Sequence, residues 1–174
     1  MDLSIIYIIR HITEDGDGCS VKINDGLMEL YGVSKAQLYA QAMHNLEMDG
    51  YHFCEMSGYM RQALCGGKDA GQKNECSLEN GKMYILRNKA GIYGAAGILN
   101  RKFIQGCLKG QNCFILPSSV HETIFLPDSD DIDQAELDNM VAEVNVACVA
   151  QEERLADHSY YYDAGTGEIR ICAL

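Results

Sequence analysis

The chain has 174 residues, of which 47% are hydrophobic and 22% are charged, a composition typical of a folded domain rather than a disordered segment. Its formal net charge is −11 at pH 7, and no apolar run approaches the ~20 residues that a membrane span needs. With no signal peptide evident at the N-terminus, these properties predict a soluble, cytoplasmic protein with a single domain over residues 1–174 and no membrane contact.

The first half of the chain predicts two strands followed by helices. Residues 3–11 and 19–23 have the pattern of strands and flank a turn rich in glycine and aspartate. A helix is expected from Ser34 to about Asn45, because Ser34 and Gln37 have the spacing of a capping box, and a shorter helix is expected at 55–64. The glycine-rich residues 65–81 predict a seam or mobile loop within the single domain.

The second half predicts hairpins that alternate with helices. We expect hairpins at 82–88 with 92–99, at 113–117 with 122–126, and at 159–163 with 168–172. Helices are expected at 101–109 and from residue 132 or 134 onward, the latter with an inward stripe formed by Leu137, Met140, Val141, Val144 and Cys148. This order predicts an α+β fold, with an antiparallel or mixed sheet of hairpins and helices packed against it.

The eight cysteines and five histidines show no spacing that is typical of a metal site. No Cys-x-x-Cys pair occurs, and the histidines at 11, 44, 52, 121 and 158 form no close pair. We therefore expect free thiols, several of them buried, with no metal site and no cofactor.

The charges are segregated along the chain. Residues 127–168 contain twelve carboxylates and one base, Arg154, whereas residues 82–121 contain six bases and no acid. The acidic segment 127–168 would attract cationic surfaces and repel nucleic acid. Its candidate partner-binding residues are Asp128, Asp130, Asp131, Asp133, Glu136 and Asp138. Helix capping and solubility are the simpler interpretation of the same residues. Direct contact with DNA is a further hypothesis, and its candidate residues are the six bases Lys82, Arg87, Lys89, Arg101, Lys102 and Lys109.

Several strings of residues resemble a family of uncharacterised proteins. They are Asn88-Lys89 with Gly91 and Gly94-Ala95-Ala96, the string Ile-Leu-Pro-Ser-Ser-Val-His-Glu at 115–122, and Tyr160-Tyr161-Tyr162-Asp163. The family is common in intestinal Firmicutes and their mobile elements and is known as a domain of unknown function. The resemblance covers nearly the whole chain and implies a fold but no activity. It also implies that many relatives have a segment upstream of residue 1. By size, charge and context, the chain is similar to anti-CRISPR inhibitors.

Ser119, His121 and Glu122 are the most chemically suggestive group. A serine, a histidine and a carboxylate are the components of nucleophilic catalysis, and Ser119 and His121 would project to the same side of an extended chain. However, neighbours of this spacing rarely meet at hydrogen-bond distance, and no nucleophile elbow is present. A hairpin tip whose serines satisfy backbone groups is the simpler interpretation.

The sequence therefore supports three functional hypotheses. The first is a non-enzymatic interaction protein, an anti-CRISPR-like inhibitor encoded by a mobile element, which binds a basic, nucleic-acid-handling protein through its acidic face. The second is a hydrolase or metal-assisted enzyme centred on Ser119, His121 and Glu122, with His158 as a further candidate. The third is a structural domain. A homodimer formed through the predicted strand at 159–163, which contains three tyrosines, is an open alternative.

Overall fold

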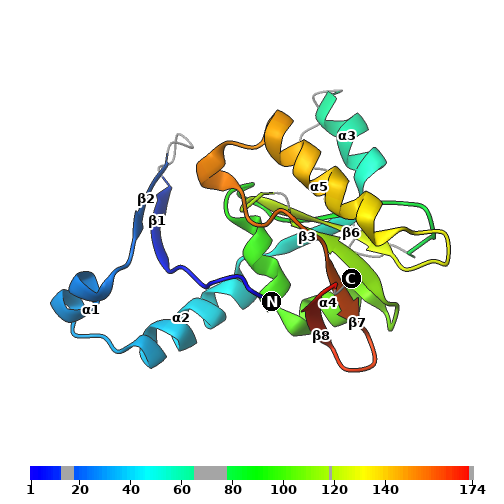
Figure 1. The fold of residues 1–174 in the computed structure, drawn as a ribbon. Helices are drawn as coiled ribbons and strands as arrows, with labels where there is room; N and C mark the ends of the chain where they lie inside the picture. Colours follow the sequence, from blue (N-terminus) through cyan, green and yellow to red (C-terminus); the bar gives the residue numbers. More distant parts are fainter. Residues whose placement is uncertain (13–17, 65–77, 118, 173–174) are drawn as a thin grey trace. The chain divides into compact units, whose positions relative to one another are not determined.

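The computed structural model describes residues 1–12, 18–64, 78–117 and 119–172 (Figure 1). The chain forms two compact units. Leu3–Met48 make up the first, which we call the hairpin unit, and Met1–Asp2 together with Asp49–Leu174 make up the second, the sheet unit. Most of the residues predicted as a seam, 65–77, lie outside the described residues, so the seam and the single domain stay predictions.

The hairpin unit consists of two strands and two helices. Strands β1 (Ile8–Ile12) and β2 (Gly18–Lys22) pair antiparallel and lie where two strands are predicted, but residues 3–7 of the first predicted strand are not in β1. Helix α1 (Asp25–Tyr31), which is not among the predicted helices, is capped by the Asn24 side chain. Helix α2 (Lys35–Met48) begins at the predicted capping box, because Ser34 Oγ accepts the Gln37 N–H at 3.3 Å and Gln37 Oε1 accepts the Ser34 N–H at 2.9 Å. Neither helix buries a residue.

The sheet unit is built on an antiparallel sheet, which has six strands within the described residues. Their order across the sheet is β3 (Tyr51–Glu55), β4 (Tyr84–Asn88), β6 (Glu122–Pro127), β5 (Cys113–Leu116), β7 (Tyr160–Asp163) and β8 (Glu168–Ile171). The pairs β5–β6 and β7–β8 are the second and third predicted hairpins. The predicted α+β fold with an antiparallel sheet is confirmed.

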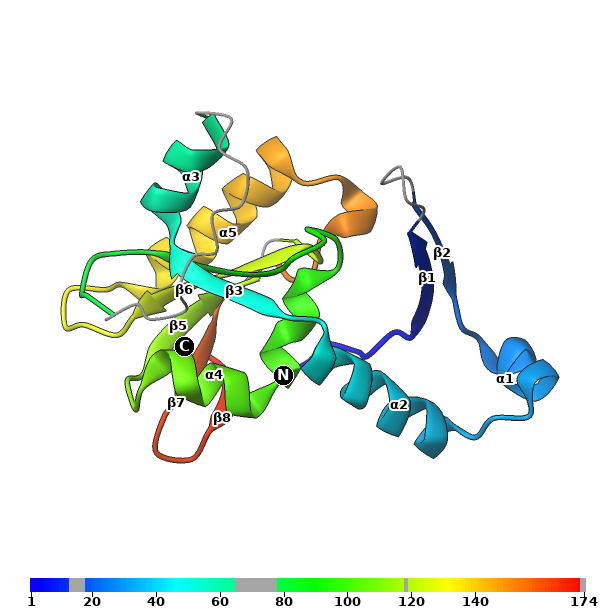
Figure 2. The same cartoon turned by 180° about the vertical axis from the view of Figure 1, so that it is seen from behind.

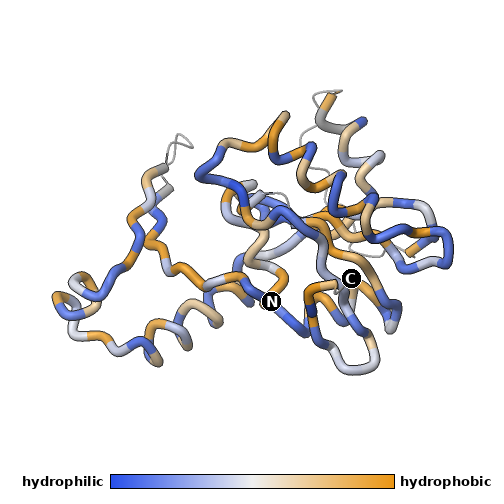
Figure 3. The backbone as a smooth tube through the Cα atoms, viewed as in Figure 1, coloured by the Kyte–Doolittle hydropathy of each residue, from blue (hydrophilic) through white to orange (hydrophobic). Residues whose placement is uncertain are grey.

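Helices cover both faces of this sheet. Helix α5 (Gln134–Cys148) lies on one side and helix α4 (Arg101–Leu108) on the other, an arrangement that can be followed in both views (Figure 1, Figure 2). Because neighbouring residues of a strand point to opposite faces, Phe125 and Leu126 of β6 enter different cores. Accordingly, β5 is apolar along its whole length, and β4 and β6 each contain a run of apolar residues next to polar ones (Figure 3).

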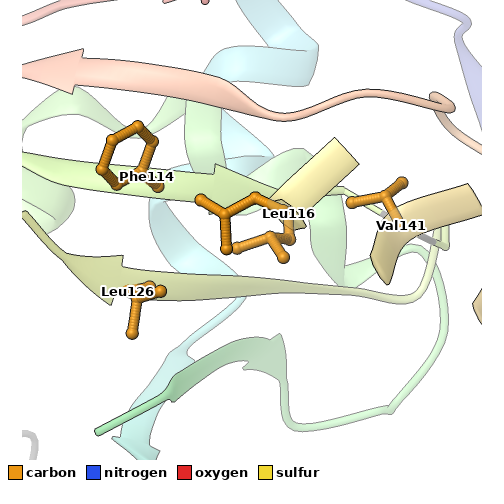
Figure 4. Close-up of a cluster of buried hydrophobic side chains, with 5 residues drawn as sticks. Phe114, Leu116, Leu126 and Val141 are labelled. Carbon is orange, nitrogen blue, oxygen red and sulfur yellow. The ribbon is translucent and has the colours of Figure 1, made fainter. Parts of the chain in front are cut away.

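The core under α5 is aliphatic with one phenylalanine. Leu137 and Val141 of α5 pack on three residues of β5 and β6, namely Phe114, Leu116 and Leu126 (Figure 4). The predicted inward stripe of α5 is thus confirmed at Leu137 and Val141, but it is wrong at Met140 and Cys148, which are exposed.

The core on the opposite face is aromatic. Phe53 stacks on Tyr84 with ring centroids 5.6 Å apart and meets Phe125 edge-on at 5.4 Å. The 3-10 helix η1 (Gly94–Leu99) and α4 close this side. Tyr51 lies 5.8 Å from the Phe103 ring of α4, and a Cβ at Gly97 would lie only 2.6 Å from the Tyr51 ring.

The prediction of a strand at 92–99 is wrong. The chain turns away after β4, and η1 occupies these residues, so β4 pairs with β3 and β6 instead of with a hairpin partner. Strand β3 was missed, since residues 51–55 were not assigned to a strand, whereas the short helix that follows was predicted and is α3 (Met56–Leu64).

The tyrosine strand β7 lies inside the sheet. It pairs with β5 on one side and with β8 on the other, so its backbone edges are not available for pairing with another chain. Tyr160 and Tyr162 are buried on the aromatic side, whereas Tyr161 lies on the α5 side. Among the described helices, none has the length and apolar character required to cross a membrane.

Candidate functional site

The segment that precedes β6 holds the predicted catalytic residues, and Ser119 has a structural role in it. Ser119 Oγ accepts the backbone N–H of His121 at 3.0 Å, which is the local serine turn expected of a hairpin tip. Ser119 also forms an isolated β-bridge with Arg154. Its neighbour Ser118 lies outside the described residues. The Ser119 hydroxyl is therefore turned to the backbone of His121.

Both ring nitrogens of His121 have partners. Nδ1 accepts the backbone N–H of Tyr93 at 3.2 Å, and Nε2 lies 3.1 Å from Oε1 of Glu153. An Nδ1 that accepts a hydrogen bond carries no proton, so neutral His121 has its proton on Nε2, facing the Glu153 carboxylate. In this arrangement neither nitrogen is available as a general base for Ser119. The geometry makes His121 a link between three segments of the chain.

Two features of the backbone accompany these contacts of His121, an unusual conformation at Tyr93 and a close approach at Gly94. Tyr93 adopts a left-handed backbone conformation with φ of 57°, which is uncommon for a residue other than glycine. At Gly94, an added Cβ would lie 2.5 Å from the His121 carbonyl oxygen and 2.7 Å from the Asn88 nitrogen. Only glycine permits this packing, which brings η1 against the start of β6.

Backbone hydrogen bonds also connect the segment before β6 to the residues that follow α5. The Val120 N–H donates to the Glu153 carbonyl at 2.9 Å, and the Ala95 N–H donates to the Val120 carbonyl at 3.2 Å. Glu153 ends the 3-10 helix η2 (Gln151–Glu153). We call this set of contacts among Tyr93, His121 and Glu153 the His121 link. His121 stands out in the sequence, but its pairing with Glu153 does not, because that pairing depends on how two distant segments meet.

Glu122 points into a different environment. It lies in β6 directly opposite Arg87 of β4, which in turn lies opposite His52 of β3. The Arg87 guanidinium stacks on the ring of Tyr59 at 4.9 Å. The three predicted catalytic residues therefore do not converge on one point. The enzyme hypothesis based on them stays a prediction.

Three of the six predicted partner-binding carboxylates have internal partners. Asp128 accepts a hydrogen bond from the Tyr161 hydroxyl at 2.6 Å, and Asp133 caps α5 by accepting the Ala135 N–H at 2.9 Å. Asp138 accepts the N–H and the hydroxyl of Ser159 at 2.7 and 2.6 Å. These contacts are structural: Asp133 caps its own helix, Asp128 joins the acidic segment to β7, and Asp138 joins α5 to the residue that precedes β7.

Four other carboxylates in this region are exposed and have no such role. They are Asp130, Asp131, Glu136 and Glu143, which we call the acidic surface. Within the described parts of the chain, none of them has a hydrogen-bond or ion-pair partner. The chain also contains no lysine or arginine between Lys109 and Arg154 that could neutralise them locally.

The six predicted basic residues differ widely in their contacts. Lys82 pairs with Glu79 at 3.0 Å and with Glu55 at 3.4 Å, and these bonds, led by the one to Glu79, raise its pKa. Arg87 is engaged with Tyr59. The others are exposed, at the end of β4 and at the two ends of α4: Lys89, Arg101, Lys102 and Lys109.

A second histidine cluster lies at the start of β7. The Asp2 carboxylate accepts the Tyr160 hydroxyl at 2.5 Å and lies 3.1 Å from Nε2 of His158. These hydrogen bonds, the one from Tyr160 first, lower the pKa of Asp2, and burial with the Asp2 contact raises the pKa of Tyr160. The cluster ties Asp2 to the sheet unit. His158 is thus engaged with Asp2.

Burial also raises the pKa of two groups near Asp128, the Tyr161 hydroxyl and the Cys113 thiol. It raises the pKa of Tyr161 to about 12, with the hydrogen bond to Asp128 acting in the same direction. Burial likewise raises the pKa of the Cys113 thiol to about 12. Across the described parts of the chain, no group of three or more His, Cys, Asp and Glu side chains is arranged to hold a metal ion.

The fold and these contacts define an α+β protein in which Ser119 and His121 are engaged in contacts within the fold, while a set of carboxylates remains exposed. A model described as a family of unknown function (DUF5688) matches residues 1–164, and the chain belongs to this family. No curated protein and no solved structure matches the chain.

Proposed function

We propose that this protein acts by binding a basic, nucleic-acid-handling protein through its acidic surface, and that it is a non-enzymatic inhibitor of the anti-CRISPR-like kind encoded by mobile elements. The observation that carries the proposal is that Asp130, Asp131, Glu136 and Glu143 are exposed and unpaired among the described residues. Side chains that have no role within the fold are available for a partner.

The electrostatics favour a cationic partner. The segment from Gly110 to Glu153 has no lysine or arginine, so no base within the segment itself offsets the charge of these carboxylates. A groove lined with lysine and arginine that normally holds phosphates is complementary to such a surface. By occupying that groove, the protein would exclude nucleic acid from its partner.

The proposal is tested by capture from a bacterial lysate at low salt. The bait is compared with a neutralised variant, Asp130→Asn, Asp131→Asn and Glu136→Gln, which leaves the structural residues Asp128, Asp133 and Asp138 intact. A matched control removes three exposed carboxylates elsewhere, through Glu29→Gln, Glu47→Gln and Glu168→Gln. Each exposed charge pair contributes ~0.2–1 kcal/mol, so the loss of three should weaken binding of a purified partner about 3- to 160-fold.

Support would consist of a nucleic-acid-binding protein that the native chain and the control capture and that the neutralised variant loses. Its affinity should also fall steeply with salt, because exposed charges are screened beyond ~10 Å at 0.1 M ionic strength. Equal capture by all three proteins, or an affinity independent of salt, would contradict the proposal.

A further inference from the structure

The outward face of α5 is apolar as well as acidic. Val146 is 79% exposed and Met140 is 38% exposed, although both are large hydrophobic residues. Three alanines on the same helix are exposed too: Ala135, Ala142 and Ala147. A helix at the surface of a domain normally presents polar residues to solvent, so an apolar outer face indicates a surface that contacts another molecule.

Helical geometry places the two exposed glutamates of α5 in line with these apolar residues. Glu136 and Glu143 are seven residues apart, which is almost two turns, so they lie on one stripe of the helix. Met140 is adjacent to both along this stripe, at spacings of four and three residues, and Val146 follows Glu143 at a spacing of three. Hydrophilic and hydrophobic segments therefore alternate along α5 (Figure 3).

The charges on this face select one kind of occupant. A second copy of the chain packed through the same face would bring carboxylates against carboxylates, with no base in residues 110–153 to compensate. A cationic partner has the opposite effect. Lysines or arginines beside an apolar ridge would pair with Glu136 and Glu143 while the ridge contacts Met140 and Val146.

We propose that the outer face of α5 docks a cationic amphipathic helix of a protein partner. This inference rests on the proposed function and specifies the chemistry of its partner. It adds an apolar contribution to binding, which an acidic surface alone would not have.

The test uses two fluorescent peptides of identical composition, each made of leucine and lysine only. In the helical peptide the leucines recur at i, i+3, i+4 and i+7, and in the scrambled peptide no helical face is apolar. Binding is measured by fluorescence anisotropy. The native protein should bind the helical peptide more tightly, and the variant Met140→Gln with Val146→Gln should lose about tenfold in affinity for it, the size expected when two apolar contacts are removed.

A matched control replaces two exposed apolar residues on other helices, Leu30→Gln and Met48→Gln, which are 76% and 74% exposed. This control should bind both peptides as the native protein does. The variant Glu136→Gln with Glu143→Gln should weaken the binding of both peptides to the same extent, because it removes negative charge from α5 and leaves Met140 and Val146 unchanged. Far-UV circular dichroism checks that each variant is folded.

The outcomes separate the two proposals. Equal binding of both peptides, with no effect of Met140→Gln and Val146→Gln, would overturn the helix-docking inference and leave the electrostatic proposal standing. Binding of neither peptide would overturn the helix-docking inference, and the capture experiment would then decide the electrostatic proposal by itself. A dimer in light scattering that Val146→Gln dissociates would assign this face to a second copy of the chain, and so would overturn the inference as well.

Discussion

Replacing Gly94 by alanine should destabilise the protein strongly, although the change adds only one methyl group. The added Cβ would lie 2.5 Å from the His121 carbonyl oxygen, 2.7 Å from the Asn88 nitrogen and 3.1 Å from the Arg87 Cα. All three are backbone atoms of segments fixed in or beside the sheet, so none can move aside as a flexible side chain would. The methyl group must separate η1 from β4 and from the start of β6.

Overpacking of this kind costs ~1–3 kcal/mol, and we expect the upper part of that range because the contacts are made on two sides. Gly106 of α4 is the matched control, since an added Cβ there meets nothing within 4 Å. Gly106→Ala should stabilise the protein by about 0.5–1 kcal/mol, the difference in helix propensity. The free energy of unfolding is measured for each variant by urea titration with far-UV circular dichroism as the signal.

Both substitutions replace glycine by alanine, so the opposite signs expected for their changes in the free energy of unfolding test the packing directly. If Gly94→Ala were as stable as the native protein, the close approach of η1 to His121 and Asn88 would be wrong. The His121 link would then lack its structural support. A similar loss at Gly106 would instead indicate a general sensitivity to alanine.

Three further predictions concern single side chains. Asp133→Ala removes the N-cap of α5 and should cost ~1 kcal/mol, seen as a fall of about 2–4 °C in Tm; an unchanged Tm would mean that the cap contributes nothing. The pKa of Asp2 is lowered below its ordinary value of 3.8, so Asp2 stabilises the fold above that pH and its contribution is lost as the pH falls through the folded pKa. Asp2→Asn should therefore reduce the difference in Tm between pH 6 and pH 3, whereas equal differences in variant and native protein would refute this role. Because the pKa of Cys113 is about 12, iodoacetamide at pH 8 should label exposed Cys148 long before Cys113 in mass spectra of the native protein; equal labelling rates would show that Cys113 is not buried.

Local signals in the sequence were sufficient to predict several elements. Ser34 and Gln37 have a spacing that works only at the start of a helix, and both of their capping hydrogen bonds are present. Likewise, the aspartates before α5 include Asp133, whose side chain caps the first turn. Such elements could be predicted because the interactions that define them lie within a few residues of the chain.

Elements that depend on distant contacts were predicted poorly. Residues 92–99 have the apolar composition of a strand, yet Gly94 and Gly97 serve close packing against β4, Tyr51 and the segment before β6, which a 3-10 helix allows. Strand β3 is defined by its pairing with β4 across a long connection, so no local pattern marks it clearly.

The candidate site shows the same division. The acidic run could be recognised by composition alone, but composition did not reveal which carboxylates are used inside the fold. That Asp128 and Asp138 bind Tyr161 and Ser159 follows from the packing of β7 beside β5 and near α5. Nor did the sequence indicate that Glu153 would contact two residues of this segment, the His121 ring through its carboxylate and the Val120 N–H through its backbone carbonyl.

The order of the strands has a consequence for how the sheet assembles. Hairpins β5–β6 and β7–β8 join neighbouring segments, so they can close rapidly and at low entropic cost. The pairings of β3 with β4 and of β5 with β7 join segments that are distant in sequence, and these pairings slow folding because a long loop must close before any hydrogen bond rewards it. Opening of the native sheet should therefore begin at the outer strands β3 and β8. The amide protons of β6, which lies between two partners at the centre of the sheet, should exchange with solvent most slowly.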